Sequence, residues 1–262
     1  MHVLVHSSFR ALRTTFNAES PQLIIADLQS LLTKNGSLIM PAFTYCYKRK
    51  TGEFEIFNPL KSKSKVGALT ESFRQSDKVV RTASATHSFS LWGKITNEIS
   101  AENAPQSPLG TGSVLDWLAE NKDTFVLLLG VDFHSLSFGH YLENIIPLPW
   151  VEKNPWEYMD VEPTGVSING EQKLIQIPGC SKSFINLEKF FLENKIISPV
   201  KYKNLRGYFI KTDLLTDHGI QYFKTFPLNV LCSVGTCKAC DIRHGWYLEK
   251  LTSDIIKDKK KQ

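Results

Sequence analysis

Short apolar runs alternate with a stretch of helical periodicity in the first part of the chain. The runs typical of buried strands are His2–His6, Ser37–Pro41 and Thr124–Leu129. Between the first two, apolar residues recur at helical spacing from Leu23 to Leu32. Pro21 stands at a favoured first-turn position, and Asn35-Gly36 ends the segment as a C-cap. The chain therefore opens with a strand, a helix and a strand.

The alternation continues towards the middle of the chain. The pattern predicts helices over Val66–Gln75 and Val114–Asn121, with a short strand over Phe89–Trp92 between them. Strands that alternate with helices at this spacing indicate layers of helices around a sheet. We therefore expect an α/β fold with a mixed, mainly parallel sheet that is flanked by helices.

A different pattern begins near residue 147, where four prolines punctuate about 17 residues. Alternating stretches over Val161–Ile168 and Gln172–Ile177 predict an antiparallel hairpin with Asn169-Gly170 at its turn. This hairpin would form a β-rich insertion at about 150–180. A helix over Phe184–Glu193, a strand over Gly207–Lys211 and a helix over Thr212–Phe223 follow. We expect one domain over residues 1–225 and a cysteine-containing C-terminal extension over 226–262.

The composition, with 42% hydrophobic and 22% charged residues among 262, is that of a soluble globular protein. No apolar run reaches the roughly 20 residues that a membrane span needs, and no secretory signal is evident, so a cytoplasmic location is expected. Part of the net charge of +5 lies in the closing lysine run, without the interleaved aromatic residues of a nucleic-acid surface. Neither a membrane nor a nucleic-acid partner is expected, and the oligomeric state stays open.

Three segments bring polar chemistry to the ends of predicted strands, where α/β proteins place their sites. In the first, Ser7, Ser8, Phe9 and Arg10 could cradle a phosphate, although they could equally form an ordinary helix cap. The second centres on Thr86-His87-Ser88. In the third, His140 and Glu143 at i, i+3 of a predicted helix would pair a base with a carboxylate that orients it.

These segments, in this order, resemble the aminoglycoside 3-N-acetyltransferase family, also called the antibiotic N-acetyltransferases. The resemblance covers roughly residues 1–225. Its landmarks are Val5-His6-Ser7-Ser8-Phe9-Arg10, Gly36–Thr44, Val66-Gly67-Ala68-Leu69, Thr86-His87-Ser88 before Trp92-Gly93, Ser107–Ser113, Leu129-Gly130-Val131 and His140-Tyr141-Leu142-Glu143.

The resemblance implies a mixed α/β fold and transfer of an acyl group from acyl-coenzyme A to an amine on a sugar. It assigns catalysis to His140 and Glu143 and coenzyme A contacts to Ser7, Ser8, Thr86 and Ser113, with Phe9 and Arg10 beside them. His87 would act secondarily, on the cofactor side. A histidine is a suitable base because its ordinary pKa lies near neutrality.

The acceptor stays open at this point. A net charge of +5 favours a nucleotide-linked amino sugar of polysaccharide biosynthesis over a polycationic antibiotic. The alternative is an aminoglycoside 3-N-acetyltransferase that confers antibiotic resistance. From other classes, a serine hydrolase is disfavoured because no Gly-x-Ser-x-Gly elbow occurs, and a non-catalytic binding protein remains as a third interpretation.

The cysteines suggest a second kind of site. Five cysteines without a signal peptide argue against a disulfide framework. In the extension, Cys232, Cys237, Cys240 and His244 could bind one structural zinc ion, since four such ligands within a short turn can converge. The competing interpretation is three reduced cysteines that pack as small apolar groups.

Overall fold

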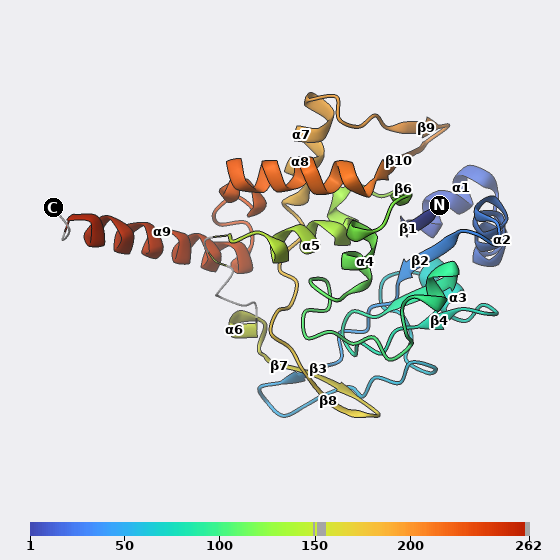
Figure 1. Cartoon of the computed structure of the whole chain (residues 1–262), viewed down its shortest axis with the longest axis horizontal. Coiled ribbons are helices and arrows are strands. Elements are labelled where there is room, and N and C mark those ends of the chain that lie inside the picture. Colours follow the sequence, from blue (N-terminus) through green and yellow to red (C-terminus); the bar gives the residue numbers. More distant parts are fainter. Residues whose placement is uncertain (149, 151–155, 260–262) are drawn as a thin grey trace.

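A seven-stranded sheet forms the central layer of the computed structural model, which describes residues 1–148, 150 and 156–259. Figure 1 shows the sheet between two groups of helices. The strand order is β4-β5-β2-β1-β6-β10-β9. The strands are β1 (His2–Ser7), β2 (Ser37–Pro41), β4 (Val80–Arg81), β5 (Phe89–Gly93), β6 (Thr124–Leu129), β9 (Val200–Tyr202) and β10 (Leu205–Lys211).

Parallel pairing is confined to the centre of this sheet. Strand β1 lies parallel to β2 and to β6, whereas the other four pairings are antiparallel. The mixed α/β fold is confirmed, but the expected predominance of parallel strands is wrong. Alternation of strands and helices does not fix strand direction, because a long connection can return the chain either way. Here residues 42–67 separate β2 from the next helix, and β5 then returns antiparallel to β2, with β4 antiparallel to β5 on its other side.

Helices cover both faces of the sheet because successive side chains of each strand point to opposite sides. Val3 and Val5 of β1 pack with α1 (Phe9–Phe16), α2 (Pro21–Leu32) and α3 (Ala68–Arg74). Leu4 points to the larger core on the other face. That core is built with α4 (Val114–Glu120), α5 (Ser137–Ile145), α7 (Phe184–Glu193), α8 (Thr212–Thr225) and the 3-10 turns η1 (Lys94–Asn97), η2 (Phe133–Ser135) and η3 (Pro227–Val230).

The β-rich insertion forms a separate three-stranded sheet in the order β3-β7-β8. The expected antiparallel hairpin is present as β7 (Val161–Ser167) and β8 (Gly170–Lys173), after the short helix α6 (Trp156–Met159). Gly170 carries the positive φ, +112°, that lets the turn close. Strand β3 (Tyr47–Arg49) joins from a distant part of the chain. Residues 151–155 of the expected insertion lie outside the described residues.

The C-terminal extension begins after α8 and packs its first part against the domain. Val230 and Leu231 at the end of η3, and Cys240 in the first turn of α9 (Lys238–Lys259), belong to the larger core. Trp246 and Tyr247 still pack against this core, and the later turns of α9 project away from the body of the molecule (Figure 1). The division into a domain over 1–225 and an extension stays a prediction. None of the described helices has both the length and the apolar character needed to cross a membrane.

Candidate functional site

The carboxyl ends of the parallel strands open into a cavity of about 360 Å³. Strands that run parallel end at one edge of the sheet, so loops from distant parts of the chain meet there. Most of the lining residues come from the ends of β1 and β2, from residues 43–47 at the start of β3, from η2 and α5, and from the loop before α7. The lining residues are His6, Ser7, Pro41, Phe43, Tyr45, Tyr47, Val66, Thr70, His87, Leu109, His134, Ser135, Leu136, Ser137, His140, Met159, Pro178, Gly179 and Ser181.

The predicted pair of His140 and Glu143 lies on helix α5, and His140 lines the cavity. His140 Nδ1 and Glu143 Oε2 are 2.6 Å apart, and both residues are buried. The spacing i, i+3 places both side chains on one face of the helix. Because Nδ1 is engaged by the carboxylate, Nε2 is the ring nitrogen left to meet a ligand in the cavity.

Arg243 stands behind this pair and was not predicted from the sequence. Its Nη1 lies 3.6 Å from Glu143 Oε1, the oxygen that His140 does not use, and the arginine is buried. A buried carboxylate without a cation beside it is costly, and Arg243 places a buried guanidinium next to this one. No sequence pattern could have found the contact, since Arg243 belongs to α9, a hundred residues away and outside the apparent domain.

His87 lies in the same cavity within an aromatic surround. Its ring meets those of Phe43, Tyr45 and Tyr47 edge-on, with centroids 4.7, 5.3 and 6.2 Å away. Burial, and next the charge of nearby His140, lowers the pKa of His87 to about 3. His87 is therefore neutral at physiological pH. An imidazole with such a low pKa is a poor proton acceptor, which leaves His140 as the better base.

A second pair of polar groups lines the same cavity, and its serine lies one helical turn before His140. Ser137 Oγ and His6 Nε2 lie 3.2 Å apart, at the start of α5 and the end of β1. Burial lowers the pKa of His6 to about 4, so this imidazole is neutral too. When His6 Nε2–H donates to the serine oxygen, the Ser137 hydroxyl hydrogen is free to point into the cavity.

The residues expected to contact coenzyme A are only partly brought together. Ser7 lines the cavity, and its hydroxyl has no partner within the described chain. Ser8 caps α1 by accepting from Ala11 N–H, with Phe9 and exposed Arg10 following in the first turn. Ser113 caps α4 and borders a different hollow of the surface. Thr86 is buried, and its carbonyl accepts from Thr44 and Tyr45 N–H. Donor binding by these residues stays a prediction.

The metal-ligand set expected from the sequence is wrong in one member. Cys232, Cys237 and Cys240 do converge, but the fourth residue among them is Cys180. His244 Nε2 instead lies 2.9 Å from the carbonyl oxygen of Cys232. Cys180 follows the insertion and stands 52 positions before Cys232, so spacing alone could not associate them.

Gly139 offers a direct test of how tightly helix α5 is packed. A Cβ added at this position would meet the Phe184 ring at 2.5 Å, and that ring contacts the His140 imidazole with centroids 4.9 Å apart. We expect Gly139→Ala to destabilise the fold by about 1–3 kcal/mol through overpacking against the Phe184 ring. Denaturant unfolding measures this free-energy change. Gly245→Ala, at a helical glycine with open space around it, should leave stability unchanged or slightly raised.

Comparison with known proteins agrees with the fold and the order of the motifs. The crystal structure of aminoglycoside acetyltransferase AAC(3)-IVa aligns with 92% of this chain and 88% of its own, at 22% identity and a TM-score of 0.76. AAC-IIIb in its binary complex with CoASH aligns over 86% and 90%, at 19% identity and a TM-score of 0.68. Among curated proteins, the prophage-derived aminoglycoside N(3')-acetyltransferase-like protein YokD of Bacillus subtilis (strain 168) is 37% identical over 82 residues.

The alignment with YokD spans 31% of this chain and only about 30% of the length of YokD. The family model described as aminoglycoside 3-N-acetyltransferase, by contrast, matches residues 4–224, which hold β1 through most of α8 and the whole His140–Glu143 pair. Since this match covers most of the chain, the protein belongs to the aminoglycoside 3-N-acetyltransferase family.

Proposed function

We propose that this protein transfers the acetyl group of acetyl-coenzyme A to an amino group of an aminoglycoside-type amino sugar. The observation that carries the proposal is the buried His140–Glu143 pair at the wall of the cavity, in a chain whose family is defined by this reaction. The structural relative AAC-IIIb was solved with CoASH, which supports a coenzyme A donor.

The reaction needs a neutral amine, because a protonated amine has no lone pair with which to attack the thioester. His140 Nε2 takes a proton from the amine as its nitrogen bonds to the acetyl carbon. Glu143 holds the imidazole through Nδ1 and stabilises the cation that forms. The C–S bond then breaks, and coenzyme A leaves as its thiol with a proton returned by His140. No acyl-enzyme is required.

The tetrahedral intermediate carries a negative oxygen that must be stabilised. The Ser137 hydroxyl, backed by neutral His6, is the side-chain donor on the wall of the cavity that fits this role. The Ser7 hydroxyl, which has no partner in the described chain, is available for the donor substrate. Both serines reach the cavity because β1 ends and α5 begins there.

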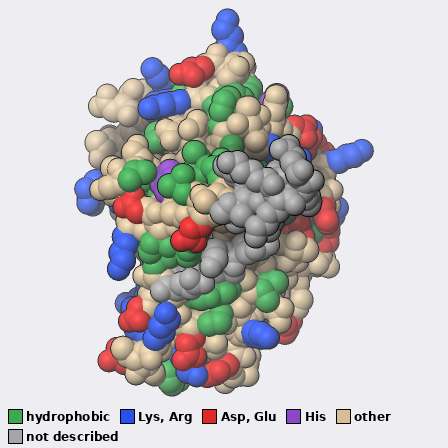
Figure 2. Space-filling view, turned by 90° about the vertical axis from the view of Figure 1, so that its left-hand side faces the viewer, with side chains coloured by type: hydrophobic (Ala, Val, Ile, Leu, Met, Phe, Trp, Pro, Cys, Tyr) green, Lys and Arg blue, Asp and Glu red, His purple; other side chains and the backbone are tan. Residues whose placement is uncertain are grey.

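For the acceptor, the comparisons favour the aminoglycoside class over a nucleotide-linked sugar of polysaccharide biosynthesis. Among the described residues no Lys or Arg lines the cavity itself, and Arg49 and Lys65 line an adjoining hollow, so the net charge of +5 does not decide the acceptor. On the face shown in Figure 2, basic and acidic side chains are interspersed. A variant of AAC(3)-IVa with the same fold was solved in complex with apramycin.

Ligand-induced thermal stabilisation followed by a thiol-release assay tests the proposal. Acetyl-coenzyme A at about 100 times its Kd should stabilise the protein by about 2.7 kcal/mol. Thiol release should then follow addition of gentamicin or apramycin. Turnover of only a nucleotide-linked amino sugar would restore the alternative acceptor. Absence of stabilisation by any acyl-coenzyme A would overturn the enzyme assignment in favour of a binding protein.

A further inference from the structure

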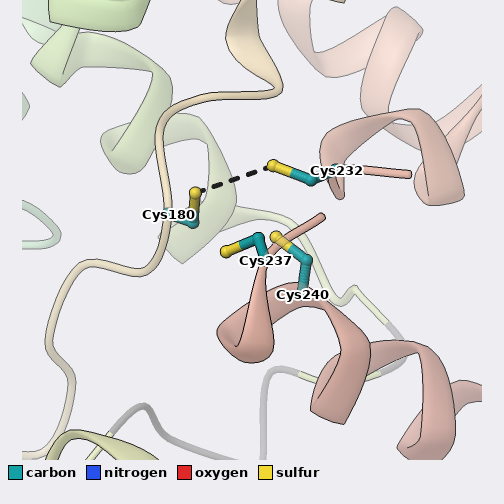
Figure 3. A group of neighbouring side chains, drawn as sticks. All are labelled: Cys180, Cys232, Cys237 and Cys240. Atoms are coloured by element: carbon teal, nitrogen blue, oxygen red, sulfur yellow. Dashed lines mark hydrogen bonds between the residues drawn. The ribbon is translucent and has the colours of Figure 1, made fainter. Parts of the chain in front are cut away.

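Four cysteine sulfurs gather beside the first turn of α9. Their Sγ atoms all lie within 4.8 Å of one another. Cys180 comes from the loop before α7, Cys232 follows η3, and Cys237 and Cys240 flank the start of α9. Figure 3 shows Cys180 approaching from a separate segment of chain and facing the other three thiols. The fold thus places four of the five cysteines at one point in space.

The separation of the sulfurs matches a metal site better than a disulfide. In a tetrahedral site with Zn–S bonds of about 2.3 Å, neighbouring sulfurs lie roughly 3.8 Å apart. Cys180 Sγ and Cys232 Sγ are 3.7 Å apart. A disulfide bond would bring the two sulfurs to about 2.05 Å and would leave the other thiols of the cluster beside it.

The backbone between Cys232 and Cys237 forms a tight turn of the kind that brings metal ligands together. Gly235, between Cys232 and Cys237, has a φ of +84°, and its N–H donates to Asp241 Oδ1 at 2.8 Å. Thr236 N–H donates to the Ser233 carbonyl and closes the same turn. On the other side, Lys182 N–H lies 3.5 Å from Cys180 Sγ, a contact that favours a sulfur carrying negative charge.

We propose that Cys180, Cys232, Cys237 and Cys240 bind one structural Zn²⁺ ion. A tetrahedral set of four sulfurs is selective for zinc or iron, and zinc needs no redox partner. All four ligands come from the protein, so no position remains for water or substrate, and the ion is structural rather than catalytic. His244 is excluded from the set because its Nε2 faces the Cys232 carbonyl oxygen instead.

One neighbour of the proposed ligands lines the cavity and another contacts Glu143, which gives the metal a role at the active site. Gly179 precedes Cys180 and lines the cavity, while Arg243 follows Cys240 by three residues and faces Glu143. The two also touch: a Cβ on Gly179 would lie 2.0 Å from Arg243 Nη2. The ion would therefore clamp the loop and the helix that hold the arginine behind the catalytic carboxylate. This consequence rests on the proposed function, whereas the metal site does not.

Metal analysis of the full-length protein, purified without chelators, tests the site. We expect about one zinc and no iron per chain, and a cobalt-substituted protein with the intense visible bands of tetrahedral thiolate ligation. Cys180→Ser should lower zinc to well below one equivalent. Cys46→Ala, which removes the cysteine outside the cluster, and His244→Ala should both retain it.

Four outcomes would overturn the proposal: protein that binds no zinc after reconstitution under reducing conditions, iron in place of zinc, zinc lost from His244→Ala but kept by Cys180→Ser, or a mass lower by two hydrogens that shows a disulfide within the cluster. Binding of acetyl-coenzyme A and thiol release are measured on the same samples. A zinc-loaded protein without acetyl transfer would refute the function and leave the site standing. An active protein without zinc would refute the metal site and leave the proposed function standing.

Discussion

His140→Ala is expected to lower kcat/KM for acetyl transfer by about 10²- to 10⁴-fold, the usual cost of removing a general base. The amine must lose its proton as it attacks, and His140 is a buried cavity histidine whose ring is held by a buried carboxylate, at 2.6 Å. Glu143→Gln keeps the imidazole in place but removes the charge that stabilises its cation, so its loss should be smaller. The measurement is release of free thiol with a saturating aminoglycoside.

The control for this experiment is His134→Ala. His134 also lines the cavity, but it is exposed and paired with Asp132 on the surface, so most of the activity should remain. If His140→Ala kept near-full turnover while His87→Phe abolished it, the roles assigned to the two histidines would be reversed.

Local sequence pattern was sufficient for the elements that make the site. The strand Thr124–Leu129 and the helix Phe184–Glu193 are found at the expected bounds. The hairpin turns at Asn169-Gly170 as expected, but its second strand is Gly170–Lys173 instead of Gln172–Ile177. His140 and Glu143 could be paired because the helix itself fixes an i, i+3 contact. An i, i+3 contact depends only on the geometry of one helix, so it can be predicted from the sequence.

The features that sequence reasoning missed all depend on distant segments meeting. Arg243 reaches Glu143 from the extension, and Cys180 replaces His244 among the thiols. The direction of β5 beside β2 follows from the path of a long connection that carries no periodic signal. The sequence pattern did not predict helix α1, because its eight residues have one narrow apolar face, with Leu12 and Thr15 as the buried positions. Such features depend on tertiary packing, and local sequence preferences do not predict them.

Lowering the pH from 7 to 5 is expected to cost about 4 kcal/mol of unfolding free energy through two buried imidazoles alone. Burial lowers the pKa of His6 to about 4, and burial together with His140 lowers that of His87 to about 3, against 6.5 in the unfolded chain. Below pH 6.5 the unfolded state therefore binds more protons than the folded state, and stability falls as the pH drops towards 4. Above pH 6.5 these two groups no longer lower the free energy of unfolding.

Urea unfolding at pH 7 and at pH 5 measures this loss. His87→Phe suits the test because Phe43, Tyr45 and Tyr47 already surround the ring, and a phenyl group cannot take up a proton. The variant should lose about 2 kcal/mol less between the two pH values than the wild type does. His134→Ala, at an exposed histidine, should follow the wild type. An unchanged loss in His87→Phe would mean that His87 is already protonated in the folded protein near pH 5, and that the neutral, aromatic-bound imidazole described for this cavity is wrong.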